Sequence, residues 1–338
     1  MGDISGGMEG NVMAVLAKKN ESVEMRKIYC QTMMEMAKED KRVIALDCDL
    51  TSPIGMTEFG NTFPDRMINC GIMEANMAGI AAGMSARGCI PFAHTFACFQ
   101  SRKCIDQIFL SAGFADLNVK YIGSDPGILA LYNGASHMGL EDMGILINVP
   151  NMTLVEPCDA VMLESVLHQV KDSYGIFYIR MNRKNAKTIY DPSTKFEIGK
   201  GLILQEGNDV TLIASGMMVE QTLEAAKLLA AEGVQARIID MFTWRPLDEE
   251  LVLNAARETG GVVTIENHRI ATGLGSAVTN LLSKKYPVPV GRIGIGDVYG
   301  EVGVLPDLLE RFFMTPQDIV SEAKAVMQIR IRGERFGS

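Results

Sequence analysis

Short apolar runs alternate with segments of helical periodicity along most of the chain. In the first half, apolar runs lie at 42–47, 89–92, 119–122, 153–155 and 176–179, and helical patterns lie at 22–40, 74–88, 100–111 and 159–172. In the second half, apolar runs lie at 210–214, 236–240, 262–266 and 288–293, and helical patterns lie at 219–232, 247–259 and 275–284. Strands that alternate with helices of this length are typical of βαβ units and parallel sheets. The pattern therefore predicts an α/β protein.

This alternation is interrupted once. Residues 181–200 are polar and contain Pro192 and Gly199. We therefore expect a domain at 22–180, a linker at 181–200 and a second domain at 201–338, preceded by a flexible leader at 1–21. A chain of 338 residues is long enough for two domains of ordinary size.

Composition narrows the classes of function. The net charge of −9 argues against non-specific binding to nucleic acid, which needs a basic surface. An uninterrupted apolar run of about 18 residues is absent, so no membrane span is expected. The seven cysteines form no CxxC pair, which favours reduced thiols in a cytoplasmic protein. The four histidines are scattered, and we expect no metal site built by this chain alone.

Glu74 is a carboxylate in an otherwise apolar, small-residue run. Ala75, Gly79 and Gly83 recur every four residues, so on a helix they form a flat ridge on which another backbone can pack. Burial of a carboxylate costs several kcal/mol unless it is partnered or protonated. Glu74 is therefore either a first-turn residue that the helix dipole favours or a functional acid.

The segment Gly273-Leu-Gly275-Ser-Ala-Val278 resembles a dinucleotide-binding turn only in part. Val278 stands at the third glycine position, and six residues separate Glu266, at the predicted strand end, from Gly273. A helix start that packs closely on a neighbour is the better interpretation.

Several other side chains are candidates for a site. Phe96 and Phe99 lie one helical turn apart, which is typical of core packing but also suits stacking on a flat heteroaromatic ring. His137 lies in a loop of small residues, where acid–base chemistry near pH 7 is as reasonable as a structural role. Arg180 and Arg183 follow a predicted strand, where an anionic group of a ligand would meet them.

Taken together, these segments resemble the C-terminal half of the thiamine diphosphate-dependent transketolase family. The run Asn69-Cys-Gly-Ile-Met-Glu74-Ala-Asn-Met77-Ala-Gly-Ile-Ala-Ala-Gly is close to the family pattern N-x-G-I-x-E-x-N-M-x-G-I-A-A-G. Thr95-Phe96-x-x-Phe99 resembles the T-F-x-x-F segment, and Gly134-Ala-Ser-His137 resembles the G-x-[ST]-H site. The resemblance extends from about residue 22 to 330. It implies two doubly wound, three-layer α/β/α domains, a pyrimidine-binding domain followed by a transketolase C-terminal domain.

The resemblance implies how this chain would hold the cofactor. Glu74 would hydrogen-bond N1′ of the aminopyrimidine and favour the tautomer that generates the thiazolium ylide. Phe96 and Phe99 would line and stack on the aminopyrimidine. Asp49 and Arg102 match positions near the cofactor.

For the substrate, the resemblance implies further roles. His137 would contact hydroxyls at the carbonyl end of the sugar and assist proton transfer, so Glu74 and His137 are the expected catalytic residues. Arg26 and Arg183 match positions that hold the distal anion, and Arg180 is a neighbouring candidate.

A partner subunit is also implied. Full-length transketolases bind the diphosphate and Mg²⁺ through an earlier G-D-G…N motif, and Gly294-Ile-Gly296-Asp297 lacks the following glycine and the downstream Asn. We therefore predict a split transketolase, in which this chain is the C-terminal subunit and a separately encoded N-terminal subunit carries the diphosphate and Mg²⁺ domain. Thiamine diphosphate and Mg²⁺ would be shared between the two, and the expected assembly is α₂β₂.

Two departures from the family pattern concern the substrate. Asp125 stands where typical members have a His near the substrate phosphate, and Asn133 replaces an acidic residue that binds a sugar hydroxyl. A carboxylate at that place would repel a dianion unless the loop differs, which suggests a specialised donor such as a sulfonated or branched ketose. The alternatives are the β-subunit of a 2-oxo acid dehydrogenase E1 component, an enzyme similar to 1-deoxyxylulose-phosphate synthase, and a non-catalytic interaction subunit.

Overall fold

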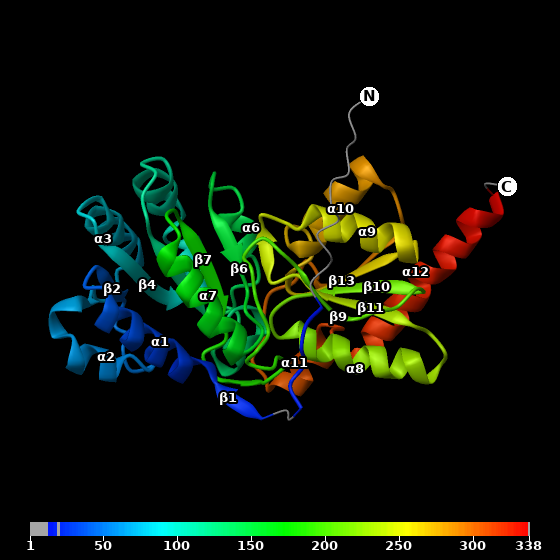
Figure 1. Cartoon of the computed structure of the whole chain (residues 1–338), viewed down its shortest axis with the longest axis horizontal. Helices are drawn as coiled ribbons and strands as arrows, with labels where there is room; N and C mark the ends of the chain where they lie inside the picture. Colours follow the sequence, from blue (N-terminus) through cyan, green and yellow to red (C-terminus); the bar gives the residue numbers. More distant parts are fainter. Residues whose placement is uncertain (1–12, 19–20, 337–338) are drawn as a thin grey trace.

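The computed structural model describes residues 13–18 and 21–336 and contains two α/β domains side by side (Figure 1). The first is built on a seven-stranded sheet of order β12-β6-β7-β5-β4-β2-β3, and the second on a five-stranded sheet of order β14-β13-β10-β11-β9. The expectation of an α/β fold with two domains is confirmed.

In the first domain, the strands and helices alternate as the apolar pattern predicts. Its strands are β1 (Ser22–Glu24), β2 (Val43–Asp47), β3 (Met67–Asn69), β4 (Ile90–Phe96), β5 (Lys120–Ser124), β6 (Thr153–Val155), β7 (Phe177–Met181) and β8 (Asn185–Lys187). Its helices are α1 (Met25–Glu39), α2 (Thr57–Thr62), η1 (Pro64–Arg66), α3 (Glu74–Ala86), α4 (Ala97–Arg102), α5 (Ile105–Gln107), η2 (Ile108–Gly113), η3 (Gly127–Asn133), α6 (Asp142–Leu146) and α7 (Ala160–Asp172).

The second half of the chain follows the same plan. Its strands are β9 (Leu202–Gln205), β10 (Val210–Ala214), β11 (Ala236–Asp240), β12 (Thr243–Arg245), β13 (Val262–Arg269) and β14 (Val290–Ile295). Its helices are α8 (Met218–Ala231), α9 (Glu249–Thr259), α10 (Leu274–Lys285), α11 (Leu305–Arg311) and α12 (Pro316–Phe336). Neighbouring strands of the five-stranded sheet are parallel except β9, which runs antiparallel to β11. The strand β12 instead pairs with β6 and extends the sheet of the first domain.

Apolar helix faces cover both sides of each sheet. In the first domain α1 packs on α7, and α3 packs on β4, α5 and η2; in the second domain α8 packs on α12, and α9 packs on α10. Two clusters of buried apolar side chains fill the space between these layers, one with Met33 and Val166 and the other with Met77 and Tyr121. The three-layer arrangement follows, because each sheet needs a cover on both faces.

Three predicted segments differ in the structure. The helical pattern at 100–111 is divided into α4, α5 and the π-helical segment η2. The apolar pattern did not reveal these breaks, because α-helical and π-helical turns place nearly the same side chains on the buried face. The predicted linker contains β8, which pairs with β1 in a separate two-stranded sheet. The segment between the apolar runs at 119–122 and 153–155, where no helical pattern was found, contains η3 and α6.

Part of the predicted flexible leader makes backbone hydrogen bonds with the second half of the chain and with the segment before it. The Ala14 backbone N–H donates to the Ile203 carbonyl at 3.0 Å, and that of Ala17 donates to the Ile189 carbonyl at 2.9 Å. Residues 13–18 of the predicted leader therefore form backbone hydrogen bonds with β9 and with the segment that contains Ile189. The remainder of that prediction, residues 1–12 and 19–20, lies outside the described residues.

A buried ion pair network joins the two domains. Arg180, on β7, is completely buried, and its Nε donates to Asp142 Oδ2 at 2.9 Å while its Nη1 pairs with Glu156. The Nη2 atom donates across the domain boundary to the Asn267 carbonyl at 2.8 Å. From the second domain, Ser215 Oγ donates to Glu156 Oε2 at 2.6 Å. Burial disfavours the charged guanidinium, but the two carboxylates outweigh it and raise the pKa of Arg180.

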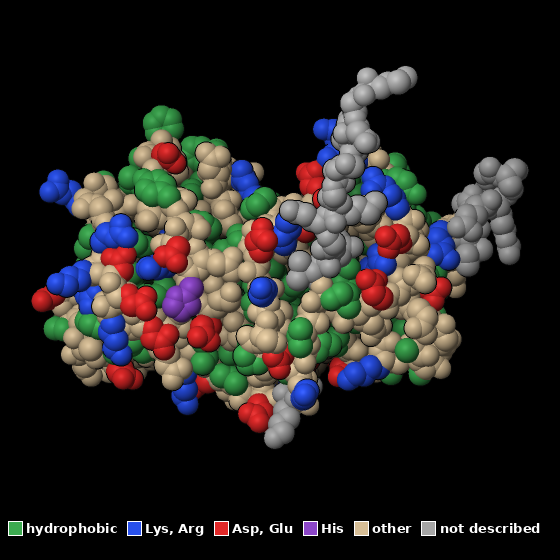
Figure 2. Space-filling model, in the orientation of Figure 1, with side chains coloured by type: hydrophobic (Ala, Val, Ile, Leu, Met, Phe, Trp, Pro, Cys, Tyr) green, Lys and Arg blue, Asp and Glu red, His purple; other side chains and the backbone are tan. Residues whose placement is uncertain are grey.

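In the part of the chain that the structure describes, none of the helices is both long and apolar enough to cross a membrane. On the face shown in Figure 2, acidic and basic side chains are interspersed.

We expect Arg180→Met to lower the free energy of unfolding by about 3–5 kcal/mol, because it leaves the buried Asp142 and Glu156 carboxylates without their counter-ion. Urea unfolding monitored by circular dichroism measures the change. Arg257→Met is the control, since Arg257 is exposed and its Nη1 donates to the half-buried Asn254 side chain, and its effect should stay below about 0.5 kcal/mol. A similar small effect for Arg180→Met would contradict the role of this network.

Candidate active site

The candidate site lies at the carboxyl edge of the seven-stranded sheet. β2, β4, β5 and β7 are parallel, and the register places Phe96 beside Ser124 and Ser124 beside Met181. The strand ends therefore share one edge, which is where α/β sheets bind ligands. The loops that follow these strands carry the residues that the sequence singled out.

Glu74 is the first residue of α3 and is only 5% exposed. Its Oε1 atom accepts a hydrogen bond from Lys103 Nζ at 2.8 Å. The two residues before it, Ile72 and Met73, are exposed. Glu74 is thus a buried, ion-paired carboxylate at a helix N-terminus, where the helix dipole also favours its negative charge.

Three rings form a cluster next to this carboxylate. The ring centroids of Phe96 and Phe99 are 6.1 Å apart, and that of His137 lies 5.6 Å from Phe96 and 5.1 Å from Phe99. His137 Nδ1 lies 2.9 Å from Ser136 Oγ. The structure therefore brings the predicted loop histidine onto the predicted aromatic pair.

Lys103 connects Glu74 to the ring cluster. Its ammonium lies 4.1 Å from the Phe99 ring centroid while it bonds Glu74. Sequence reasoning did not select Lys103. Its spacing could have indicated that Lys103 lies near Phe99, because residues four apart on a helix share a face and Lys103 follows Phe99 by four.

Arg183 and Asp125 form an ion pair at the ends of neighbouring strands. Arg183 Nε donates to Asp125 Oδ2 at 2.6 Å, and the guanidinium lies 5.0 Å from the Phe96 ring centroid. Asp125 is 2% exposed with a φ of 49°, a left-handed conformation that Asp tolerates better than most residues. Burial raises the pKa of its carboxyl, and the charge of Arg183 opposes that rise.

Arg26 lies beside this pair. Arg26 Nη1 and Arg183 Nη1 donate to the same acceptor, the Pro53 carbonyl, at 3.1 and 3.3 Å. Arg26 Nε also donates to Glu24 Oε1 at 2.8 Å. Both arginines line one surface groove, which Leu131 also borders.

The other predicted site residues lie around this centre. Asp49 is exposed after β2, and its Oδ1 accepts from Asn69 Nδ2 at 3.2 Å. Arg102 holds the loop of His137, since its Nη2 donates to the Met138 carbonyl at 3.3 Å. Asn133 is exposed at the end of η3.

Arg180 does not belong to the site. Its guanidinium is completely buried and bonded to Asp142, Glu156 and the Gly139 and Asn267 carbonyls. The prediction that Arg180 binds substrate is corrected: its position after an apolar run suggested the open edge of the sheet, but the second domain covers it.

The interpretation of the Gly273 segment as a tight helix start is confirmed. Glu266 Oε2 and Oε1 accept the backbone N–H groups of Leu274 and Gly275 at 2.7 and 3.0 Å. A Cβ at Gly273 would lie 1.6 Å from Glu266 Oε2. The Glu266 side chain therefore occupies the N-terminus of α10, where a dinucleotide-binding turn would hold a phosphate.

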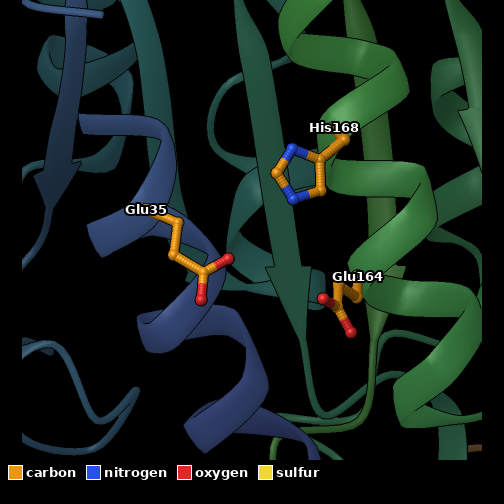
Figure 3. Close-up of side chains that lie close together, drawn as sticks. All are labelled: Glu35, Glu164 and His168. Atoms are coloured by element: carbon orange, nitrogen blue, oxygen red, sulfur yellow. The ribbon is translucent and has the colours of Figure 1, made fainter. Parts of the chain in front are cut away.

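Within the described residues, one group of three metal-ligating side chains lies together, formed by Glu35 of α1 and Glu164 and His168 of α7 (Figure 3). Their ligand atoms lie within 4.8 Å of one another. This group stands on the helical layer of α1 and α7, and no described contact joins it to Glu74.

Comparison with known proteins defines the class of this protein. Residues 21–188 match the model of the transketolase pyrimidine-binding domain, and residues 199–319 match that of the transketolase C-terminal domain. The chain belongs to the transketolase family.

Its similar relatives include subunits of split transketolases. The chain is 43% identical to a 6-deoxy-6-sulfo-D-fructose transketolase subunit of Clostridium sp. (strain MSTE9), over 92% of this chain and 96% of the relative. It is 33% identical to an apulose-4-phosphate transketolase subunit of Phocaeicola vulgatus, over 82% and 89% of the two chains. By contrast, it spans 49% of the transketolase of Homo sapiens, at 33% identity over 90% of this chain.

A solved structure agrees with these relatives. A split gene transketolase, described as an inactive beta4 tetramer, is similar with a TM-score of 0.85 and 38% identity, covering 90% of this chain and 99% of that chain. The expectation of a C-terminal transketolase subunit is confirmed.

Proposed function

We propose that Glu74 is the acid of the cofactor site of a ketol-transferring enzyme whose active centre this chain completes together with a partner subunit. The observation that carries this proposal is the buried Glu74 carboxylate, which the Lys103 ammonium joins to the Phe99 ring and, through it, to His137. A carboxylate, two apolar rings and an imidazole at one sheet edge suit a heteroaromatic ring with a polar edge and a sugar next to it.

The residues present fit one half of thiamine diphosphate. When bound, this cofactor supplies a thiazolium carbon that takes up the two-carbon ketol unit. Glu74 Oε1 accepts a hydrogen bond from Lys103, so this oxygen can accept or share a hydrogen bond at the edge of the aminopyrimidine. Phe96 and Phe99 exclude water from that ring. His137, with its ring against both, lies where it can exchange a proton with a sugar hydroxyl.

Glu74→Gln should lower kcat for ketol transfer by about 10²–10⁴-fold in the complex reconstituted with the partner subunit, thiamine diphosphate and Mg²⁺, because an amide cannot exchange the proton. Glu224→Gln is the matched control, since Glu224 also accepts a hydrogen bond from a lysine at 2.8 Å but is exposed. Activity of Glu74→Gln equal to that of the wild type would show that the assignment of Glu74 is wrong.

The diphosphate and Mg²⁺ are proposed to be bound by the separately encoded subunit, and the complex is proposed to be an α₂β₂ heterotetramer. Apolar side chains are exposed around the N-terminus of α3, with Ile72 at 73%, and Phe114, beside η2, is 85% exposed. A Cβ added at Gly79 or Gly83 would meet no atom of the described residues within 4 Å, so this ridge of α3 is uncovered. Such a surface suits a protein partner. A cytoplasmic location is also proposed, which seven free cysteines favour.

Phe114→Ser should weaken association with the partner subunit about tenfold, because the interface would lose a large apolar side chain. Analytical ultracentrifugation or titration calorimetry measures the dissociation constant. Phe313→Ser serves as the control, because Phe313 is 70% exposed but belongs to the second domain. Equal effects of the two changes would argue against docking at this surface.

The proposed donor is a specialised ketose. Arg26 is paired with Glu24, and Arg183 is paired with Asp125, but Lys184 also lines the groove, so the three cations exceed the two carboxylates by one charge. A phosphate carries about −1.5 to −2 charges near neutral pH, whereas a sulfonate carries one, and an excess of one positive charge matches the smaller charge better. The relative that acts on 6-deoxy-6-sulfo-D-fructose supports a sulfonated donor, and the one that acts on apulose 4-phosphate makes a branched donor the second candidate.

The reconstituted enzyme should turn over 6-deoxy-6-sulfo-D-fructose with a kcat/KM at least about tenfold above that for xylulose 5-phosphate. Asp125→Asn should narrow this ratio, because it frees the charge of Arg183 for a dianion. Asp191→Asn, at an exposed turn, should leave the ratio unchanged. Normal efficiency with xylulose 5-phosphate would remove the reason for an unusual donor.

A further inference from the structure

Lys103 makes two contacts at once, and both of its partners belong to the candidate site. Its Nζ donates to Glu74 Oε1 at 2.8 Å and lies 4.1 Å from the centroid of the Phe99 ring. The ammonium is therefore held between a carboxylate and an aromatic face, through an ion pair and a cation–π contact.

The position of Lys103 is not explained by the end of its own helix. Lys103 is the C-cap residue of α4, and its backbone N–H donates to the Phe99 carbonyl. A cation at a helix C-terminus commonly approaches the last carbonyl groups. Here the ammonium instead approaches the first residue of a different helix, α3, 29 positions earlier in the chain.

The pair also differs from an ordinary surface ion pair. Glu74 has 5% of its side chain exposed, whereas Lys103 has 45% exposed. Among the described residues, the side chain that hydrogen-bonds the Glu74 carboxylate is Lys103. A buried carboxylate needs such a partner, and a long, half-exposed lysine can leave at modest cost by turning into solvent.

We propose that Lys103 is a displaceable counter-ion that competes with the aminopyrimidine of thiamine diphosphate for Glu74 and Phe99. This inference rests on the proposed function, in which the aminopyrimidine bonds the Glu74 carboxylate and stacks on Phe99. The ammonium makes a hydrogen bond to the same carboxylate and lies over the same ring, so the two groups exclude each other. Lys103 is thus a positioning residue that keeps Glu74 paired and sets the affinity for the cofactor.

The test is calorimetric titration of thiamine diphosphate, at saturating Mg²⁺, into the complex with the partner subunit. Lys103→Met should bind the cofactor about fivefold more tightly than the wild type, because the competing ion pair is gone. Lys103→Arg keeps the charge and should remain close to the wild type. Lys227→Met, which removes an equally short but exposed lysine–glutamate bond, should have no effect.

A second comparison separates competition from a general change in structure. In the Glu74→Gln background the ion pair is already weakened, so Lys103→Met should change cofactor affinity by less than about twofold. An equal gain in both backgrounds would overturn the proposal, because the effect would then not pass through Glu74. Unchanged or weaker binding by Lys103→Met would overturn it as well.

These outcomes are distinguishable from failure of the proposed function. If the wild-type complex and every variant fail to bind thiamine diphosphate, the proposed function and the competition fall together. If the wild type binds and Lys103→Met does not bind more tightly, the proposed function stands and only the role of Lys103 is wrong. Size-exclusion chromatography of each complex establishes that assembly is intact.

Discussion

The buried guanidinium of Arg180 is the constraint on which the arrangement of the two domains depends. It sits at the end of a central strand and is neutralised by Asp142 and Glu156, while its remaining donors reach backbone carbonyls on both sides of the domain boundary. Because an unpaired buried charge costs several kcal/mol, none of these groups can shift independently. The loop that carries Gly139 and Asp142 is thereby fixed, and with it the segment that presents His137.

The sheet and its ion pairs determine the geometry of the candidate site. Parallel strands deliver side chains to one edge, and short-range charge pairing then orients them, as in Arg183 with Asp125 and Lys103 with Glu74. Each carboxylate is buried and each cation is more exposed. Such pairs hold the acids in place and leave the cations able to respond to a ligand.

The chain also shows the physical logic of a divided enzyme. In the proposed function, Glu74 and the Phe96–Phe99 pair receive a heteroaromatic ring, while the uncovered ridge of α3 and the exposed Phe114 leave room for a second protein beside them. A diphosphate and a divalent cation need many oxygen and N–H ligands. The sequence lacks the motif that supplies them in full-length transketolases, and the proposed partner supplies it instead.

The sequence by itself determined the α/β alternation and the transketolase resemblance, because these depend on local periodicity and on short motifs. It also selected Phe96, Phe99 and His137, which the structure brings together, and Glu74, which Lys103 joins to Phe99. It missed β8 and β12, because their short sequences, Asn-Ala-Lys and Thr-Trp-Arg, are mostly polar and form no apolar run. Only the tertiary structure decided which charged residues are buried and which residues they pair with. Arg180 and Arg183 are three positions apart, yet one is sealed beneath the second domain and the other lies at the site. Likewise, the contact of Lys103 with Glu74 joins two helices, and Asp125 is neutralised by a residue 58 positions away. Ion pairing depends on the distance between side chains in space, and burial depends on which distant segment covers a residue. The order of residues along the chain does not contain this information.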